Sequence, residues 1–170
     1  AKRKNKKILL CLGAVDWRSD VYVNGNKIVT HEGGYDPFTI DITGALKKGS
    51  KQRLSVRVWD PTDEGPQPHG KQVVNPRGIW YTPVTGIWQT VWLETVPDTS
   101  IRDIKIVPDI DQSIVKLTAN TTSSSEDEDV VITIKQGNKI IKTQQGKANT
   151  ELNIPVPAEK LWSPDHPFLY

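Results

Sequence analysis

Residues 20–30 read DVYVNGNKIVT, and this stretch decides the fold of the first half of the chain. Two short runs of β-branched and aromatic residues flank the dipeptide Asn24-Gly25. Asn-Gly supplies the two positive φ angles that a type I′ turn needs, so the stretch predicts a β-hairpin. We therefore expect an antiparallel strand on each side of this turn.

The alternation of apolar and polar residues that is typical of a strand also occurs outside the hairpin. It recurs in four further runs: residues 54–59, 87–94, 114–119 and 130–135. A second hairpin is expected around Gln136-Gly137-Asn138, whereas residues 41–47 could form at most one helical turn. Many short strands separated by turn residues are typical of a sandwich or barrel, so we predict an all-β fold.

The composition changes near residue 97. Five of the six tryptophans precede this point, and the strands that follow it are rich in Ile, Val and Thr. Domain boundaries commonly coincide with such changes. We therefore predict two domains, residues 1–96 and residues 97–170.

Charge and cysteine content exclude several classes of protein. The formal net charge is only +2, from 22 basic and 20 acidic side chains, so no long-range field draws in nucleic acid or an anionic membrane. The basic cluster at residues 2–7 is interpreted as a solvated end. No apolar run approaches the roughly 20 residues of a membrane span, and no signal peptide is recognised. Cys11, the only cysteine, is expected to be a buried small hydrophobe, compatible with cytoplasm, periplasm or secretion.

Residues 60–83 break the strand pattern and are the first candidate for function. This segment holds five prolines and three glycines, and irregular loops of this length are commonly functional. Trp80-Tyr81 closes it, and aromatic faces stack on the C–H faces of sugars. The candidate substrate-binding residues on this rim are Lys71, Gln72, Arg77, Trp80 and Tyr81, each of which could equally stabilise the loop. Trp88 and Trp92 are interpreted as core or inter-domain packing on one strand face.

No catalytic set is recognised. Asp60, Asp63 and Glu64 are interpreted as solvated loop acids, because glycosidic cleavage needs two carboxyl groups held about 5–10 Å apart on rigid elements. The histidines have no second ligand at metal spacing, and the acidic loop at residues 123–129 is interpreted as a solvated hairpin end. We therefore predict no catalytic residue, no metal site and no cofactor in this chain.

Three segments, GAVDW (13–17), VYVNG (21–25) and GGYDPFTIDIT (33–43), resemble the N-terminal sugar-binding-like jelly roll of glycoside hydrolase family 2. GKQ (70–72) and GIWYTPVTGIWQTVWLE (78–94) resemble its closing strands, and LWSPDHPFLY (161–170) is similar to the immunoglobulin-like module that follows it. The resemblance implies a galactose-binding-like jelly roll followed by an immunoglobulin-like sandwich. Both are expected to be truncated, the first lacking its opening strands and the second its last strand or strands.

The resemblance also implies a function. Members hydrolyse β-galactosides, β-glucuronides and β-mannosides with retention, using two glutamates on a TIM barrel that follows these modules. The chain is accordingly expected to be a non-catalytic N-terminal fragment of a β-galactosidase-like parent, with the barrel as its partner and a β-glycoside or oligosaccharide as ligand. No sodium site is expected, since Trp80-Tyr81-Thr82 stands where some relatives carry the ligating acid.

Two alternatives remain open at this point. One is an autonomous carbohydrate-binding module, and the other is a structural or adhesive pair of sandwiches. Incomplete sandwiches would leave exposed edges, through which a homo-oligomer could form.

Overall fold

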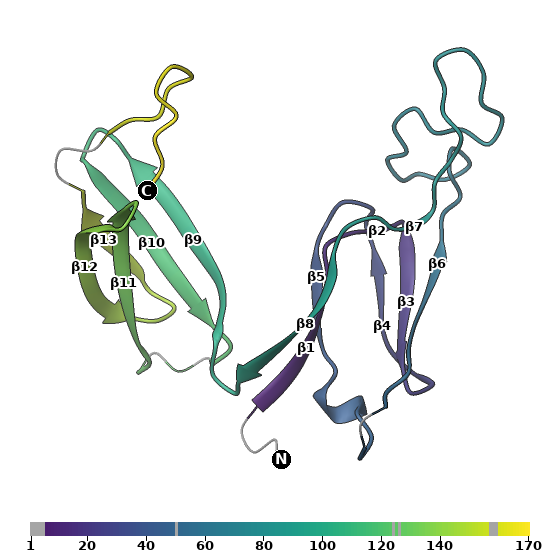
Figure 1. Ribbon diagram of the computed structural model, residues 1–170, viewed down its shortest axis with the longest axis horizontal. Coiled ribbons are helices and arrows are strands. Elements are labelled where there is room, and N and C mark those ends of the chain that lie inside the picture. The colour runs from purple at the N-terminus through teal and green to yellow at the C-terminus, as the bar shows by residue number, and fades with distance from the viewer. Residues whose placement is uncertain (1–5, 50, 124, 126, 157–159) are drawn as a thin grey trace. The chain divides into compact units, whose positions relative to one another are not determined.

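The chain divides into two compact units, Ala1–Pro97 and Asp98–Tyr170, in a computed structural model that describes residues 6–49, 51–123, 125, 127–156 and 160–170 (Figure 1). The boundary expected after residue 96 and the division after residue 97 differ by one residue. Residues 2–5 of the basic cluster, and Ser124 and Glu126 of the acidic loop, lie outside the described residues.

The first unit is a β-sandwich of antiparallel sheets. Its elements are β1 (Lys6–Leu12), β2 (Val15–Asp16), β3 (Arg18–Val23), β4 (Asn26–Glu32), β5 (Phe38–Asp41), the 3-10 turn η1 (Thr43–Ala45), β6 (Leu54–Trp59), β7 (Gly86–Ile87) and β8 (Val91–Pro97). One sheet has the order β5-β1-β8, the other has the order β4-β3-β6, and β2 pairs with β7. The predicted hairpin is confirmed, since Asn24 and Gly25, at φ 53° and 89°, connect β3 to β4.

The core of this unit lies between the two sheets. Alternate residues of β1 and β3 meet there, in a buried cluster of Leu10, Leu12, Val15, Val21, Val23, Ile40 and Ile42. Cys11 is also buried, as expected. Because β3 alternates strictly, burial of Ser19, Val21 and Val23 on one face leaves the residues between them on the outward face.

The structure corrects the prediction of one strand over residues 87–94. Gly86–Ile87 pairs with β2, whereas Val91–Pro97 pairs with β1, and the chain breaks between them. Trp88 lies in the break and Trp92 on β8, and they are 51% and 41% exposed. The expectation that both lie on one strand face is therefore wrong, and their exposure also excludes both from the core of the first unit, whereas inter-domain packing stays a prediction.

The second unit is also a β-sandwich. Its strands are β9 (Ile101–Asp109), β10 (Ile114–Thr121), β11 (Asp129–Gln136), β12 (Lys139–Lys147) and β13 (Glu151–Pro155), in sheets of order β13-β10-β9 and β11-β12. The second predicted hairpin is confirmed, because Gly137, with φ 55°, turns β11 into β12. Leu117, Ala119 and Ile154 form the buried core.

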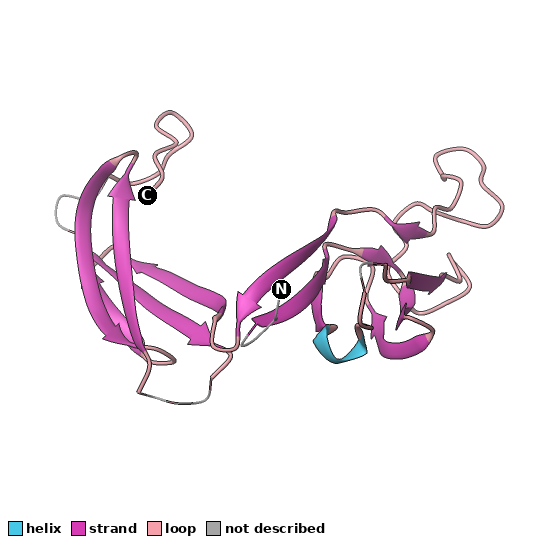
Figure 2. Ribbon diagram, turned by 60° about the horizontal axis from the view of Figure 1, so that its bottom comes forward, coloured by secondary structure: helices cyan, strands magenta, loops and turns pink. Residues whose placement is uncertain are grey.

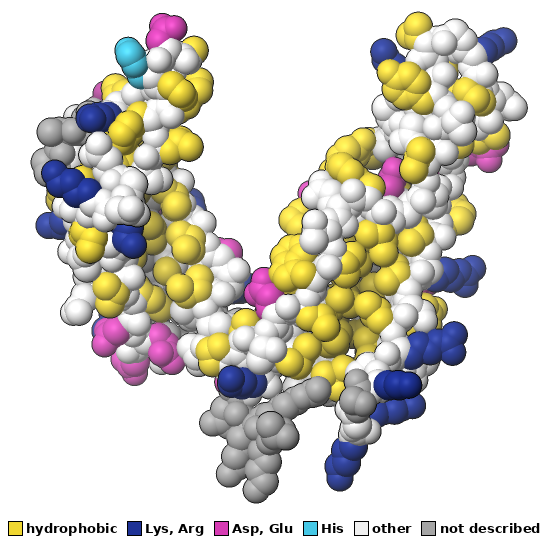
Figure 3. Space-filling model, viewed as in Figure 1, with side chains coloured by type: hydrophobic (Ala, Val, Ile, Leu, Met, Phe, Trp, Pro, Cys, Tyr) yellow, Lys and Arg dark blue, Asp and Glu magenta, His cyan; other side chains and the backbone are white. Residues whose placement is uncertain are grey.

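Part of the inner face of this second sandwich is uncovered. Ile104 and Ile106 on β9 pair with Ala119 and Leu117, so their side chains point to the same inner face. They are nevertheless 52% and 60% exposed, because the described part of the facing sheet contains only β11 and β12. In Figure 3, hydrophobic side chains are exposed over the strands of each unit.

The prediction of an all-β protein made of two sandwiches is confirmed (Figure 2). Over the described ranges the only helical element is the three-residue η1. None of the helices there has the length and apolarity to cross a membrane.

Candidate functional site

The segment between β6 and β7 is tied together by the carboxylate of Asp60. Its Oδ1 accepts hydrogen bonds from the backbone N–H of Thr62 at 2.8 Å and from Gln67 Nε2 at 3.2 Å. Its Oδ2 accepts a hydrogen bond from the hydroxyl of Thr85 at 3.1 Å. Because Asp60 follows β6 and Thr85 precedes β7, one side chain joins the beginning and the end of the loop.

A second set of bonds orders the middle of the loop. The N–H of Val73 donates to Tyr81 O at 3.1 Å, and the N–H of Tyr81 donates to Lys71 O at 2.8 Å. Gln72 Oε1 accepts a hydrogen bond from the N–H of Val84 at 2.6 Å, and Asp63 Oδ1 accepts one from the N–H of Val74 at 2.9 Å. Asp60 and Asp63 are loop acids, as interpreted from the sequence, and each also accepts a hydrogen bond from loop backbone.

An open hollow of about 400 Å³ lies between this loop and the adjacent end of the sandwich. Its walls come from the loop, from β2 and β7, and from the bend before β5. The lining residues are Asp16, Tyr35, Gln72, Tyr81, Thr82, Val84, Thr85, Gly86, Ile87 and Trp88. All belong to the first unit.

Aromatic rings form much of this wall. Tyr35 and Trp88 meet edge to face, with ring centroids 5.8 Å apart. Trp88 Nε1 donates to Gly34 O at 2.7 Å, which fixes the indole plane. Tyr81 is 59% exposed, so its ring is available to a ligand. Exposed aromatic faces beside amide and hydroxyl groups are suited to sugar rings.

Asp16 brings a carboxyl group to the hollow. Burial, and then the negative charge of Asp60, raise the pKa of Asp16 above its usual value. Gly34 allows the close approach of this carboxylate, because a Cβ at that position would lie 2.5 Å from Asp16 Oδ1. The oxygens of this carboxyl group can accept hydrogen bonds from ligand hydroxyls.

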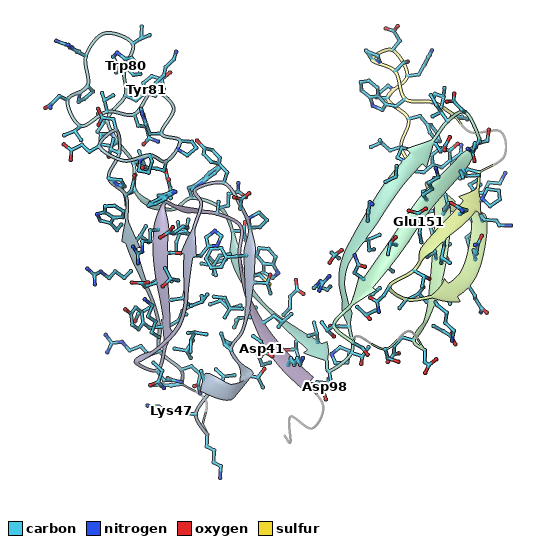
Figure 4. All side chains as sticks on the ribbon, turned by 180° about the vertical axis from the view of Figure 1, so that it is seen from behind. Asp41, Lys47, Trp80, Tyr81, Asp98 and Glu151 are labelled. Atoms are coloured by element: carbon cyan, nitrogen blue, oxygen red, sulfur yellow. The ribbon has the colours of Figure 1, made fainter. Side chains whose placement is uncertain are left out.

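The structure separates the five predicted rim residues. Gln72 and Tyr81 line the hollow. Lys71 does not line the hollow, but its Nζ lies over the Tyr81 ring, 5.9 Å from the ring centroid, in cation–π range. Trp80, 44% exposed, and Arg77 are not among the lining residues, and the Trp80 N–H donates to Arg77 O at 3.1 Å. Figure 4 shows Trp80 and Tyr81 at the outer end of the loop.

Sequence reasoning missed most residues of the hollow, among them the polar and aromatic side chains of Asp16, Tyr35, Thr85 and Trp88. Pairing of Val15 with Ile87 and of Asp16 with Gly86 brings the second strand of the chain to the end of the loop. The Gly33-Gly34-Tyr35 bend indicated that another part of the chain comes close to its backbone. It did not indicate that the side chains of Asp16 and Trp88 are the groups that do so. Over the residues that the structure describes, no group of three or more His, Cys, Asp or Glu could hold a metal ion.

An aromatic-walled hollow at the loop end of a β-sandwich, with a few polar groups beside the rings, is suited to hold a sugar ring. The galactose-binding domain-like model of glycosyl hydrolase 2 matches residues 1–82, and the model for glycosyl hydrolases family 2 matches residues 99–170. The chain belongs to glycosyl hydrolases family 2, and the resemblance seen in the sequence is confirmed.

Individual relatives agree with this assignment. A β-galactosidase of Thermoanaerobacter pseudethanolicus is 30% identical over 98% of this chain and 23% of its own length. A putative β-glucuronidase of Formosa agariphila is 33% identical over 98% of this chain and 20% of its own length. The structure of a Ruminococcus gnavus β-glucuronidase in complex with D-glucuronic acid superposes with a TM-score of 0.73 and 25% identity, over 99% of this chain and 30% of that one. The chain thus spans between a fifth and a third of the length of these relatives, consistent with an N-terminal fragment of a glycoside hydrolase.

Proposed function

We propose that this chain is the non-catalytic part of a retaining β-glycosidase, and that the hollow beside residues 60–85 forms part of the rim of the substrate pocket. The observation that carries the proposal is the hollow itself, in which Tyr35, Tyr81 and Trp88 present aromatic surface next to the polar groups of Asp16 and Gln72. This combination suits the alternating apolar and hydroxyl faces of a sugar.

We assign bond cleavage to a TIM barrel of the parent protein, which the family resemblance implies as the domain after the second sandwich. The residues of the hollow would orient the sugar or its aglycone instead of transferring protons. Relatives named as β-galactosidases and β-glucuronidases favour a β-galactoside or a related β-glycoside as the substrate.

The proposal is tested in the full-length protein that contains this chain. Tyr81→Ala removes an exposed lining ring and should lower kcat/KM for a β-galactoside about tenfold or more, while the melting temperature stays unchanged. Ile79→Ala is the matched control, because Ile79 is 66% exposed in the same loop and does not line the hollow. Equal activity of the two variants would exclude a substrate contact at Tyr81.

Trp80 and Arg77 are tested separately, because neither lines the hollow in this structure. If they reach substrate only when the catalytic barrel is present, Trp80→Ala should also lower activity in the full-length protein without unfolding it. Unchanged activity would leave Trp80 with a structural role at the turn it makes with Arg77.

An autonomous carbohydrate-binding module is the second candidate, and one observation favours it. All residues that line the hollow belong to the first unit, so the site needs no other part of a protein to exist. Calorimetric titration of the 170-residue chain with galactose and β-galactosides separates the candidates. Millimolar or tighter binding supports the module, whereas binding that appears only in the full-length protein supports the rim.

A further inference from the structure

A second hollow of the first unit lies at the opposite end of β6 from the long loop. It measures about 550 Å³, and its lining includes three cationic side chains, Lys47, Arg53 and Arg57, and no carboxylate. Figure 3 shows Lys and Arg side chains gathered on the β6 side of this unit, and Lys47 is labelled in Figure 4 beside the turn that precedes β6. We call this site the basic hollow.

The three cations have no partner that would explain their convergence. Over the described residues, no ion pair involves Lys47, Arg53 or Arg57. The nearest carboxylate in the strand register is Asp20, opposite Arg57. Asp20 already accepts hydrogen bonds from Lys27 Nζ and Thr30 Oγ1, each at 2.7 Å. Converging unpaired cations repel one another, and an anionic ligand relieves this repulsion.

The outward face of β6 continues the site as a narrow strip. Val56 and Val58 pack toward the core. The residues on either side of them, Arg53, Ser55, Arg57 and Trp59, therefore all lie on the opposite, outer face. At the rise of an extended strand, Arg53 and Trp59 stand about 20 Å apart. This length suits a short oligomer better than a single small anion. Trp59 packs on Trp17 with ring centroids 5.8 Å apart but stays 53% exposed, so part of its ring surface remains for stacking at one end.

Two hydroxyl groups complete the chemistry. Tyr22 and Ser55 lie opposite each other across β3 and β6, and both line the basic hollow. Neither side chain makes a hydrogen bond within the described parts of the chain, so both can bond to ligand hydroxyls. Arg53 is positioned from behind, because its N–H donates to Asn24 Oδ1 at 3.0 Å and its carbonyl accepts from the Asn24 N–H at 2.7 Å.

We infer that the basic hollow binds an acidic oligosaccharide, through carboxylate or sulfate groups held by Arg53, Arg57 and Lys47. Guanidinium groups recognise planar carboxylates and tetrahedral sulfates with paired N–H donors. The strip of Ser55 and Trp59 then receives the neighbouring sugar. The hollow beside residues 60–85, called the loop hollow from here on, shares no lining residue with the basic hollow. The inference about the basic hollow is therefore independent of the role proposed for the loop hollow.

The inference is tested by calorimetric titration of the 170-residue chain at 50 mM salt. The probes are a galacturonic acid trimer, a sulfated galactose trimer and the neutral galactose trimer. At least one acidic trimer should bind, the tighter of the two identifying the preferred anion, and the neutral trimer should bind at least tenfold more weakly. Raising the salt to 200 mM should weaken the binding of the acidic trimer.

Arg53→Gln/Arg57→Gln should weaken binding of the acidic trimer at least tenfold. Lys105→Gln/Lys142→Gln is the matched control, since it removes the same charge from exposed positions of the second unit and should leave affinity unchanged. Thermal melts of both variants show that the fold is retained. Retained binding in the arginine variant, equal loss in the control, or equal affinity for the neutral trimer would overturn the inference.

Two further probes separate the other sources of negative charge. Inorganic sulfate that binds as tightly as the trimers would reduce the site to a simple anion site and overturn the assignment to a saccharide. An oligothymidylate that binds more tightly than either trimer would assign the surface to nucleic acid instead. Loss of activity in Tyr81 variants bears only on the loop hollow, so the two proposals can fail separately.

Discussion

The hydroxyl of Thr85 donates a 3.1 Å hydrogen bond to the carboxylate of Asp60, across 25 residues of sequence. This bond joins the end of β6 to the start of β7, so the long loop begins and ends at one side chain. The same carboxylate accepts from Thr62 and Gln67 inside the loop. The order of the loop hollow therefore depends on a residue that does not line it.

We expect Asp60→Ala to loosen the loop and to lower stability by about 2 kcal/mol, because three hydrogen bonds lose their acceptor. The loss should be local, so hydrogen exchange of the Thr62 and Tyr81 amides should accelerate more than exchange in β1. Asp111→Ala is the control, since that exposed carboxylate accepts none of the hydrogen bonds found in the described chain. Equal exchange rates in both variants would show that Asp60 does not order the loop.

Gly34→Ala is expected to destabilise the first unit by about 1–3 kcal/mol, because the new Cβ would lie 2.5 Å from Asp16 Oδ1. Gly44→Ala is the matched control, since a Cβ there meets nothing within 4 Å. Urea denaturation measures both. If the cause is the contact with Asp16, the double variant Gly34→Ala/Asp16→Ala should recover most of the loss, and additive losses would contradict it.

Local chemistry explains which parts of this fold could be predicted. Asn24-Gly25 and Gly137 are turns whose φ angles depend on the residues themselves, so both hairpins follow from the sequence. The break between Ile87 and Val91 does not follow from the sequence, because the alternation of apolar and polar residues continues through it without a turn residue. Only pairing of β7 with β2 and of β8 with β1 separates the two strands.

For the candidate site as well, only the residues that belong to one local segment could be predicted from the sequence. Gln72 and Tyr81 were found because they belong to the segment that breaks the strand pattern. Asp16 and Trp88 were not, because the long-range pairing of β2 with β7 brings them there, and Tyr35 was not, because its ring meets Trp88 only in the folded chain. The basic hollow also depends on register, which places Ser55 opposite Tyr22 and Arg57 opposite Asp20. Sequence spacing alone carries no information about such cross-strand neighbours.

Asp16→Asn should stabilise the protein at neutral pH, by less than about 1 kcal/mol for this partly solvated group. Burial and the charge of Asp60 raise the pKa of Asp16 in the folded state. A raised carboxyl pKa means that the folded state binds more protons than the unfolded state between the two pKa values. Stability from this group is therefore present at low pH and lost as the pH rises through the folded pKa.

The measurement is urea denaturation of both proteins from pH 2.5 to pH 7. The difference between them should be smallest below the usual pKa of Asp, 3.8, and should grow as the pH rises. Other carboxyl groups, such as that of Asp41, have lowered pKa values and lose their contribution as the pH falls, but they do so in both proteins. A difference that is constant with pH would show that Asp16 does not titrate differently on folding.

The uncovered face of β9 should make the 170-residue chain associate with itself. Ile104 and Ile106 point to the inner side of the second sandwich but stand outside its buried cluster, and they line a groove of about 590 Å³ beside β11. Sheet edges and apolar faces left in this state pair with other chains. Sedimentation velocity should therefore show a mass that increases with protein concentration.

Ile104→Thr/Ile106→Thr should reduce this association at least several-fold, because threonine keeps the β-branched shape while removing apolar surface. Val107→Thr is the control, since Val107 lies on the same strand opposite Lys116, on the outer face, and is 41% exposed. It should leave the association unchanged. A cooperative, monodisperse monomer of the unsubstituted chain at every concentration would contradict the prediction, because the exposed isoleucines would then be tolerated in water without a partner.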